Sequence, residues 1–272
     1  MNCIVVMPTY NERPNIAAVI AAVLANGPEW RVLVVDDNSP DGTGQVVDQL
    51  AAAEPRIRVL HRAGKLGLGT AYRDGLTLAL KSKGGVAQPP SAVSNVAEAP
   101  SPRNGQPGAA VPHFFDSPAD YICTMDSDFS HNPAVLPELR RLAEAHGAAH
   151  GSRYVAGGAV QDWGLTRKFN SAVANILTRL LFGVNLRDCT SGFRCYRRDV
   201  LERLEVATLT ARGYAVLEEL LYRCSRIGVK PAEFPITFVD RKAGESKINA
   251  GESFRGLTML LKLKLRGWRA RG

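Results

Sequence analysis

Two aspartates, Asp126 and Asp128, follow an apolar run in the stretch TMDSDFSHNP at residues 124–133. Side chains two residues apart in an extended chain project from the same face, so these carboxylates would lie together. Two carboxylates on one apolar face repel each other unless they share a proton or a cation. A hard cation such as Mg²⁺ or Mn²⁺ suits them, because it takes oxygen ligands and is often completed by substrate phosphates. The spacing predicts a metal site, with an ordinary turn or helix cap as the alternative.

A second acidic group closes another apolar run in VVDDNSPDGTG at residues 34–44. Asp37 is predicted to accept hydrogen bonds from the ribose hydroxyls or base N–H groups of a nucleotide. Asp41 and Thr43 are better explained as caps of the helix that follows. The sequence after the first apolar run is PTYNERPN rather than GxGxxG, and GKLGLGT lacks the lysine position of a Walker sequence. These departures argue against a dinucleotide oxidoreductase and a P-loop NTPase.

Five basic side chains stand in polar or glycine-rich surroundings: Arg153, Arg167, Arg194, Arg241 and Lys247. A guanidinium group binds phosphate through two hydrogen bonds at once, and lysine supplies a compact positive charge. Each of them alone is typical of a solvated surface. Together with a metal site they favour a substrate that carries several phosphates.

The elements that must position these residues alternate along the chain. Apolar runs predict strands at residues 3–10, 31–37, 57–61 and 120–126, and 3.6-residue periodicity predicts helices at 13–27, 43–54 and 67–82. This order predicts an α/β fold with a mostly parallel sheet and helices on both faces. Further helices are expected at 133–147, 165–182 and 214–228, with extended segments at 148–154 and 230–241. Ligands of such sheets bind beyond the carboxyl ends of the strands. Three polar clusters fall at those ends: PTYNE, DDNSPDG and DSDFSHNP.

The domain organisation follows from composition. Residues 1–250 are expected to form one domain, and residues 82–118, which hold seven of the 16 prolines, are predicted to be a disordered insertion. The net charge is +8, and the segment from Arg241 to Gly272 contains nine Lys or Arg against two Glu. Residues 251–272 therefore predict a basic amphipathic segment suited to an anionic membrane surface. Nucleic acid is not an expected partner, because no base-stacking aromatic residues accompany the basic charge.

Neither a secretory leader nor an apolar run of membrane-spanning length is visible, so a cytoplasmic protein is expected.

The motifs jointly resemble those of the polyprenol-phosphate (dolichol-phosphate) mannosyltransferases of glycosyltransferase family 2. The likeness runs from about residue 3 to residue 250, apart from the proline-rich stretch, and rests on MPTYNE, VVDDNSPDGTG, KLGLGTAYRDGL, MDSDFSHNP, GSRY, TSGFR and DRKAGESK. The resemblance implies a GT-A fold and a divalent metal, Mg²⁺ or Mn²⁺. It also implies inverting transfer of mannose from GDP-mannose to a polyprenyl phosphate, which gives polyprenyl-phosphate mannose and GDP.

The resemblance also assigns roles by matching position. It implies that a nucleoside pocket is formed by Pro8, Tyr10, Glu12, Val35 and Asp37. The implied metal ligands are Asp126, Asp128 and Ser130, with Ser127 beside the donor diphosphate. Donor contacts are expected from Arg153, Arg241 and Lys247, and contact with the acceptor phosphate from Arg167. Arg194 is expected to bind substrate phosphate as a member of the basic group above, not by matching position. The residues expected to carry catalysis are Asp126, Asp128 and Arg167.

Two alternatives stay open at this point. The pocket motifs do not by themselves determine the base or the sugar, so a related lipid-phosphate glycosyltransferase that uses UDP-glucose or another nucleotide sugar is one alternative. A non-catalytic nucleotide-sugar-binding protein, with a site disabled by the insertion, is the other. The expected location is the cytoplasmic face of a membrane, as a peripheral protein, and a small membrane subunit is an open question.

Overall fold

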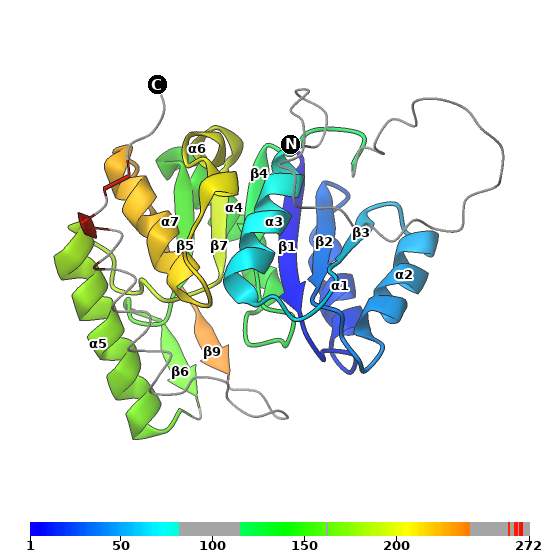
Figure 1. Ribbon diagram of the computed structural model, residues 1–272, viewed down its shortest axis with the longest axis horizontal. Helices are drawn as coiled ribbons and strands as arrows, with labels where there is room; N and C mark the ends of the chain where they lie inside the picture. Colours follow the sequence, from blue (N-terminus) through cyan, green and yellow to red (C-terminus); the bar gives the residue numbers. More distant parts are fainter. Residues whose placement is uncertain (82–114, 162, 240–260, 262–263, 266, 269–272) are drawn as a thin grey trace.

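The structure is a computed structural model that describes residues 1–81, 115–161, 163–239, 261, 264–265 and 267–268. Within these ranges a seven-stranded sheet runs in the order β3-β2-β1-β4-β7-β5-β8 (Figure 1). Its strands are β1 (Cys3–Thr9), β2 (Trp30–Asp36), β3 (Ile57–His61), β4 (Tyr121–Thr124), β5 (Ala148–Ser152), β7 (Arg194–Arg197) and β8 (Ala232–Pro235). Neighbouring strands are parallel except where β7 pairs with β4 and β5. The predicted α/β fold with a mostly parallel sheet is confirmed.

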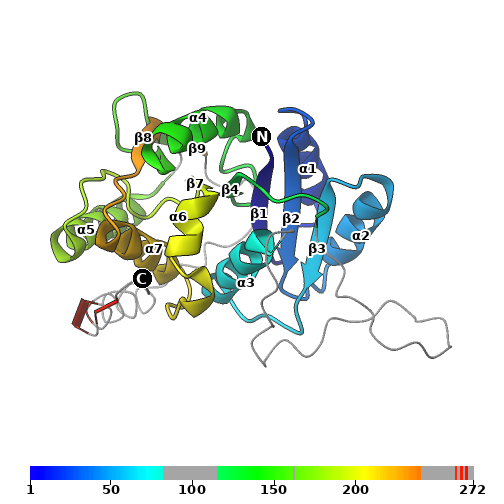
Figure 2. The ribbon, with the colours of Figure 1, turned by 90° about the horizontal axis from the view of Figure 1, so that it is seen from above.

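Helices cover both faces of the sheet (Figure 2). The first face packs against α1 (Ile16–Leu24), α2 (Thr43–Ala53), the 3₁₀ turn η1 (Pro133–Val135) and α4 (Leu136–His146). The second face packs against α3 (Leu68–Leu80), α6 (Arg198–Arg203), the 3₁₀ turn η2 (Val206–Thr208) and α7 (Ala215–Arg226). Because apolar layers lie on both sides, the central strands are apolar on both faces and read as continuous runs rather than alternating ones.

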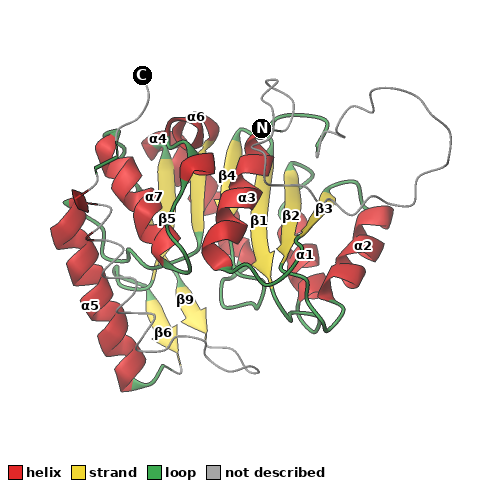
Figure 3. Ribbon diagram, viewed as in Figure 1, coloured by secondary structure: helices red, strands yellow, loops and turns green. Residues whose placement is uncertain are grey.

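A smaller element stands beyond the carboxyl edge of the large sheet (Figure 3). It consists of β6 (Ala159–Gln161) paired in parallel with β9 (Thr237–Val239), and α5 (Leu165–Phe182) follows β6 in the chain. The helix predicted at 165–182 has the observed bounds of α5. The strand β6 was not predicted, since three exposed or half-exposed residues carry too little apolar pattern.

Other differences have local causes. The helix predicted at 133–147 divides into η1 and α4, because Pro137 occupies the first turn of α4 and lacks the N–H of a helix interior. The strand β7 was not predicted, because its sequence RCYR looks polar. Most of the predicted insertion and most of the basic segment lie outside the described residues. Among the helices that the structure does describe, none is long and apolar enough to cross a bilayer.

Candidate active site

The carboxyl ends of β1, β2 and β4 meet at one edge of the sheet, as the strand order requires. The backbone N–H of Asp37 donates to the Thr9 carbonyl oxygen at 3.0 Å, which ties the segment after β2 to the end of β1. The Ser127 hydroxyl donates to the Pro8 carbonyl oxygen at 3.4 Å, which ties the segment after β4 to β1 as well. The three polar clusters that the sequence singled out are therefore neighbours in space.

The Asp126–Ser130 loop turns tightly around the second carboxylate. Asp128 Oδ1 accepts hydrogen bonds from the backbone N–H of Ser130 at 3.0 Å and from its hydroxyl at 2.5 Å. Between them Phe129 adopts a left-handed backbone with φ of 60°. Ser130 is buried, so its hydroxyl orients the Asp128 carboxylate from the protein side. Ser130 remains a predicted ligand, and its visible role is to hold Asp128.

A buried histidine supports the first aspartate. The backbone N–H of Asp126 donates to His131 Nδ1 at 3.2 Å, and Asp126 Oδ2 lies 3.9 Å from the same nitrogen. The imidazole stacks on Phe193 with ring centroids 4.9 Å apart. Burial lowers the pKa of His131, an effect that outweighs the opposing influence of the two aspartates. The neutral ring, with Nδ1 accepting, fixes the start of the loop without adding a positive charge.

The oxygen donors of this loop fit a hard divalent cation. The carboxylates of Asp126 and Asp128 are partly exposed on one short turn. Within the described ranges, no group of three or more His, Cys, Asp or Glu side chains could hold a metal ion. Mg²⁺ is usually bound by one or two carboxylates, and substrate phosphates complete its coordination. The loop would thus hold a cation together with a phosphate-bearing ligand.

Asp37 is more strongly tied to the protein than the sequence suggested. Its Oδ1 forms a buried ion pair with Arg62 Nη1, and its Oδ2 accepts from the Gly67 backbone N–H at 2.9 Å. Arg62 also donates to the Thr70 hydroxyl at the start of α3. Asp37 therefore positions the segment from Arg62 to Gly67, and any contact with a nucleoside would use its remaining acceptor capacity.

Of the other residues expected in the nucleoside pocket, Tyr10 and Glu12 lie after β1, whereas Val35 lies in the core. Tyr10 is half-buried, and its ring lies 4.2 Å from Lys65 Nζ, which brings an aromatic face and a cation to the edge beside Asp37. Glu12 accepts from the Asn15 side-chain amide at 3.1 Å. Val35 corrects the expectation: its side chain is fully buried in the apolar layer beneath α3, so it cannot line a pocket with that side chain.

Arg153 also departs from the expectation of a free donor contact. It follows β5 and forms a two-point buried ion pair with Asp188, with Nε–Oδ2 and Nη2–Oδ1 distances of 2.7 Å. Its Nη2 donates to the Thr190 hydroxyl as well, at 2.6 Å. Burial alone would raise the pKa of Asp188, but the hydrogen bonds and charge of Arg153 outweigh it and hold that pKa below its usual value. Much of the hydrogen-bonding capacity of Arg153 is thus used inside the protein.

Aromatic rings link the head of α5 to the aspartate loop. The Arg167 guanidinium lies 4.1 Å from the centroid of the Trp163 ring, and Arg153 lies 5.0 Å from the same ring. The Trp163 ring meets Phe238 edge-on at 5.4 Å, and Phe238 meets His131 at 5.6 Å. The predicted residue Arg167 is therefore connected to the Asp126 region through packed rings.

Arg194 is a correction. Its side chain is completely buried and donates to three backbone carbonyl oxygens, of Ser191 at 2.6 Å, Leu217 at 2.7 Å and Cys189 at 2.8 Å. The guanidinium group therefore joins the loop before β7 to α7, and it is not a phosphate contact. Arg241 and Lys247 lie outside the described residues.

The sequence reasoning missed two residues at the centre of the site. Tyr72, on α3, and Gly192, in the loop before β7, both approach Asp126. Both lie inside quoted motifs, Tyr72 in KLGLGTAYRDGL and Gly192 in TSGFR, but neither side chain carries a charge, and Tyr72 follows the apolar periodicity of its helix. Only the packing of α3 against the sheet reveals them.

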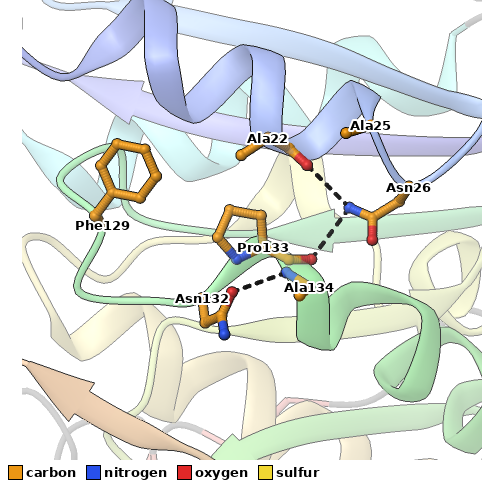
Figure 4. A pocket seen from close by; sticks show the side chains of 7 residues that line it. All are labelled: Ala22, Ala25, Asn26, Phe129, Asn132, Pro133 and Ala134. Carbon is orange, nitrogen blue, oxygen red and sulfur yellow. Dashed lines mark hydrogen bonds between the residues drawn. The ribbon is translucent and has the colours of Figure 1, made fainter.

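A shallow pocket of about 470 Å³ lies beside this edge, between the end of α1 and η1 (Figure 4). Its lining residues are Ala22, Ala25, Asn26, Phe129, Asn132, Pro133 and Ala134. The Asn26 side chain bridges α1 and η1, because it donates to the carbonyl oxygens of Ala22 and Pro133 at 3.2 Å (Figure 4). Because the lining contains no titratable group, the chemistry belongs to the neighbouring aspartate loop.

Three comparisons place these features among known proteins. The profile of Glycosyl transferase family 2 matches residues 4–81 and 95–205. Polyprenol monophosphomannose synthase of Mycolicibacterium smegmatis is 36% identical over 274 residues, which cover 99% of this chain and 90% of that protein. Undecaprenyl-phosphate mannosyltransferase of Micrococcus luteus is 34% identical over 251 residues, which cover 92% and 89% of the two chains.

Solved structures are similar in fold. A crystal structure of glucosyl-3-phosphoglycerate synthase from Mycobacterium tuberculosis, in complex with Mn²⁺, UDP-glucose and phosphoglyceric acid, has a TM-score of 0.60. The match is 19% identical in sequence and covers 97% of this chain and 79% of that chain. At this level of identity the likeness concerns the fold alone.

Proposed function

The chain belongs to glycosyl transferase family 2, and on that premise we propose that it transfers mannose from GDP-mannose to a polyprenyl phosphate. It is a glycosyltransferase with a GT-A fold. The observation that carries the proposal is the identity of at least 34% with two polyprenyl-phosphate mannosyltransferases over at least 92% of the chain. The products would be polyprenyl-phosphate mannose, with inversion at the anomeric carbon, and GDP.

The donor side of the reaction is assigned to the aspartate loop and the edge beside it. Asp126 and Asp128 would hold Mg²⁺ or Mn²⁺, which supplies positive charge against the departing diphosphate. Ser130 keeps Asp128 in orientation, since its hydroxyl and backbone N–H both donate to that carboxylate. Tyr10 and Asp37 would receive the nucleoside, and Arg241 and Lys247 stay predicted donor contacts.

The acceptor side is assigned to the head of α5. The second pKa of a phosphate monoester is about 6, so the attacking oxygen is already ionised near neutral pH and needs no strong general base. The work left to the protein is positioning and charge stabilisation. Arg167 brings a guanidinium group to this place, and the stacking on Trp163 sets its position. The charge of Arg153 is largely balanced by Asp188, so Arg167 is the cation proposed to meet the acceptor phosphate.

A panel of nucleotide sugars tests this function. We expect mannose transfer from GDP-mannose to a short-chain polyprenyl phosphate with Mg²⁺ or Mn²⁺, and loss of transfer when EDTA removes the metal. The anomeric configuration of the product, measured by NMR, should be the inverse of the donor's. Turnover of UDP-glucose instead would show that the donor assignment is wrong, and binding of a nucleotide sugar without any turnover would identify a non-catalytic protein.

The structure also offers a surface for the membrane in which such an acceptor resides. On α5, four large apolar side chains project from one face at helical spacing; this α5 stripe consists of Phe169, Val173, Ile176 and Leu180. Phe169 and Leu180 are 69% and 74% exposed. The helix carries Arg167, Lys168 and Arg179 and no acidic residue. An apolar stripe flanked by basic residues is suited to an anionic membrane surface.

We therefore propose a peripheral protein on the cytoplasmic face of a membrane, with residues 1–250 as the catalytic domain. The basic segment at 251–272 would add electrostatic attraction, since each basic residue near an anionic surface contributes about 1 kcal/mol. A small membrane subunit is a proposed partner at the bilayer.

The α5 stripe can be tested with liposomes that contain anionic lipid. Serine at both Phe169 and Leu180 should weaken flotation with the vesicles by about tenfold or more, because two large apolar side chains no longer enter the interface. Leu66 and Phe129, which are also exposed, provide the matched control, in which the same two residue types are changed to serine away from α5. Equal flotation of the two double variants would contradict a role for the stripe.

A further inference from the structure

Polar side chains converge on Gly192, next to the first aspartate of the loop, where this residue has no side chain of its own. A methyl group added at Gly192 would lie 3.2 Å from the Tyr72 hydroxyl, 3.6 Å from Asp126 Oδ1 and 3.8 Å from His131 Cε1. The carbonyl oxygen of Gly192 accepts from the Thr124 hydroxyl at 2.7 Å, which holds the glycine in place against the end of β4. We call the position that a side chain at residue 192 would occupy the Gly192 recess. It is bordered by one hydroxyl group, one carboxylate oxygen and the edge of an imidazole ring.

The Tyr72 hydroxyl reaches the recess from α3. Tyr72 is fully buried, and its hydroxyl has no hydrogen-bond partner in the part of the chain that the structure describes. A buried polar group without a partner destabilises a fold, and phenylalanine would fill the same volume without that cost. The hydroxyl is therefore explained better by a ligand that pairs with it than by the stability of the unliganded protein.

The chemistry of the recess selects the kind of group that would pair there. At neutral pH the tyrosine hydroxyl can donate, and the Asp126 carboxylate can only accept. A group placed between them must accept from one and donate to the other, which a hydroxyl group does. A phosphate oxygen would face the Asp126 charge without a proton to donate, and an ammonium group could not accept from Tyr72.

From this geometry we propose that the Gly192 recess binds a hydroxyl group of the hexose that is transferred, with Tyr72 donating and Asp126 accepting. The inference rests on the proposed function, because it takes the ligand at this edge to be a nucleotide sugar. It adds a residue pair, Tyr72 and Gly192, that sets how the sugar lies against the aspartate loop.

The test is the variant Tyr72→Phe, compared with Tyr121→Phe as a matched control. Tyr121 is a buried tyrosine at the opposite end of β4 from Asp126. Binding of GDP-mannose and of GDP is measured by calorimetry with Mn²⁺, together with kcat, KM and the melting temperature. For Tyr72→Phe we expect about tenfold weaker binding of GDP-mannose, unchanged binding of GDP, and an unchanged or higher melting temperature. Tyr121→Phe should not distinguish the two ligands.

A second variant, Gly192→Ala, and deoxy analogues of the donor test whether a sugar hydroxyl occupies the recess. Gly192→Ala would put a methyl group into the recess, so it should also weaken binding of GDP-mannose relative to GDP. Among deoxy analogues of the donor, the one that lacks the paired hydroxyl should bind the wild type and Tyr72→Phe equally well. Equal losses of GDP and GDP-mannose binding in Tyr72→Phe, or no loss of either, would overturn the proposal.

The outcomes separate this inference from the proposed function. If the wild type transfers mannose and Tyr72→Phe matches it in donor binding, kcat and KM, the recess proposal fails and the function stands. If the wild type uses another nucleotide sugar, the same comparison with that sugar and its free nucleotide tests the recess, and the donor assignment alone fails. If the wild type binds no nucleotide sugar at all, both fail.

Discussion

Replacing Asp128 with alanine is expected to lower kcat for glycosyl transfer by about two to three orders of magnitude, while the protein stays folded. The reason is that Asp128 presents the carboxylate held by Ser130 at the carboxyl edge, where the proposed cation meets the donor diphosphate. Asp128 is only partly buried, so its loss leaves no buried charge without a partner. Initial rates at saturating donor and thermal unfolding of the same preparation measure the two effects separately.

Two variants serve as comparisons. Asp48→Ala removes a carboxylate that is 52% exposed on α2, and it should leave the rate unchanged. Ser130→Ala removes the hydroxyl that orients Asp128 while the carboxylate remains, so its rate should fall between those of the wild type and Asp128→Ala. Wild-type turnover by Asp128→Ala would remove the aspartate loop from the mechanism.

The largest expected effect on stability belongs to the ion pair between Arg153 and Asp188. Asp188→Ala should lower the free energy of unfolding by about 3–5 kcal/mol, because it leaves the buried Arg153 guanidinium without its counter-charge. The Arg153 and Asp188 side chains are 6% and 0% exposed, so water cannot compensate for the loss. Urea unfolding at neutral pH measures this change in the free energy of unfolding.

A surface pair provides the control. Arg197 and Asp199 form a pair of similar geometry with side chains that are 42% and 51% exposed. Asp199→Ala should cost less than about 1 kcal/mol, since solvent screens exposed pairs. If both variants unfold at the same urea concentration, the buried pair contributes no more than a surface contact.

The same pair predicts a dependence on pH. The pKa of Asp188 lies below its ordinary value of 3.8 in the folded protein, so its carboxylate stabilises the fold at every pH above that value. The stabilisation should be lost as the pH falls below about 4 through the lower folded pKa. The stability difference between the wild type and Asp188→Asn, followed by urea unfolding between pH 6 and pH 3, should shrink over the acidic end of that range.

Much of the site was predictable because its residues are close in sequence to strand ends. An apolar run followed by polar residues determines where a strand stops, and parallel strands bring their carboxyl ends to one edge. This reasoning placed Tyr10, Asp37, Asp126 and Asp128 at that edge. It failed for Arg153, whose partner Asp188 is 35 residues away, and for Arg194, whose partners include a carbonyl oxygen of α7. An arginine in a polar stretch looks the same in sequence whether it is solvated or buried.

The amino-acid sequence by itself determined the α/β fold, the bounds of α5 and the aspartate loop at the carboxyl edge, because each depends on periodicity or spacing over a few residues. The tertiary structure alone decided that Arg153 and Arg194 are held by internal partners and that Val35 faces the core. It also decided that the Tyr72 hydroxyl, which has no partner among the described residues, lies near Gly192 and Asp126. The physical reason is that burial and hydrogen-bond partnership depend on how α3, α7 and the loop before β7 pack against the sheet. These segments are far apart in the chain, and no local pattern records their contacts.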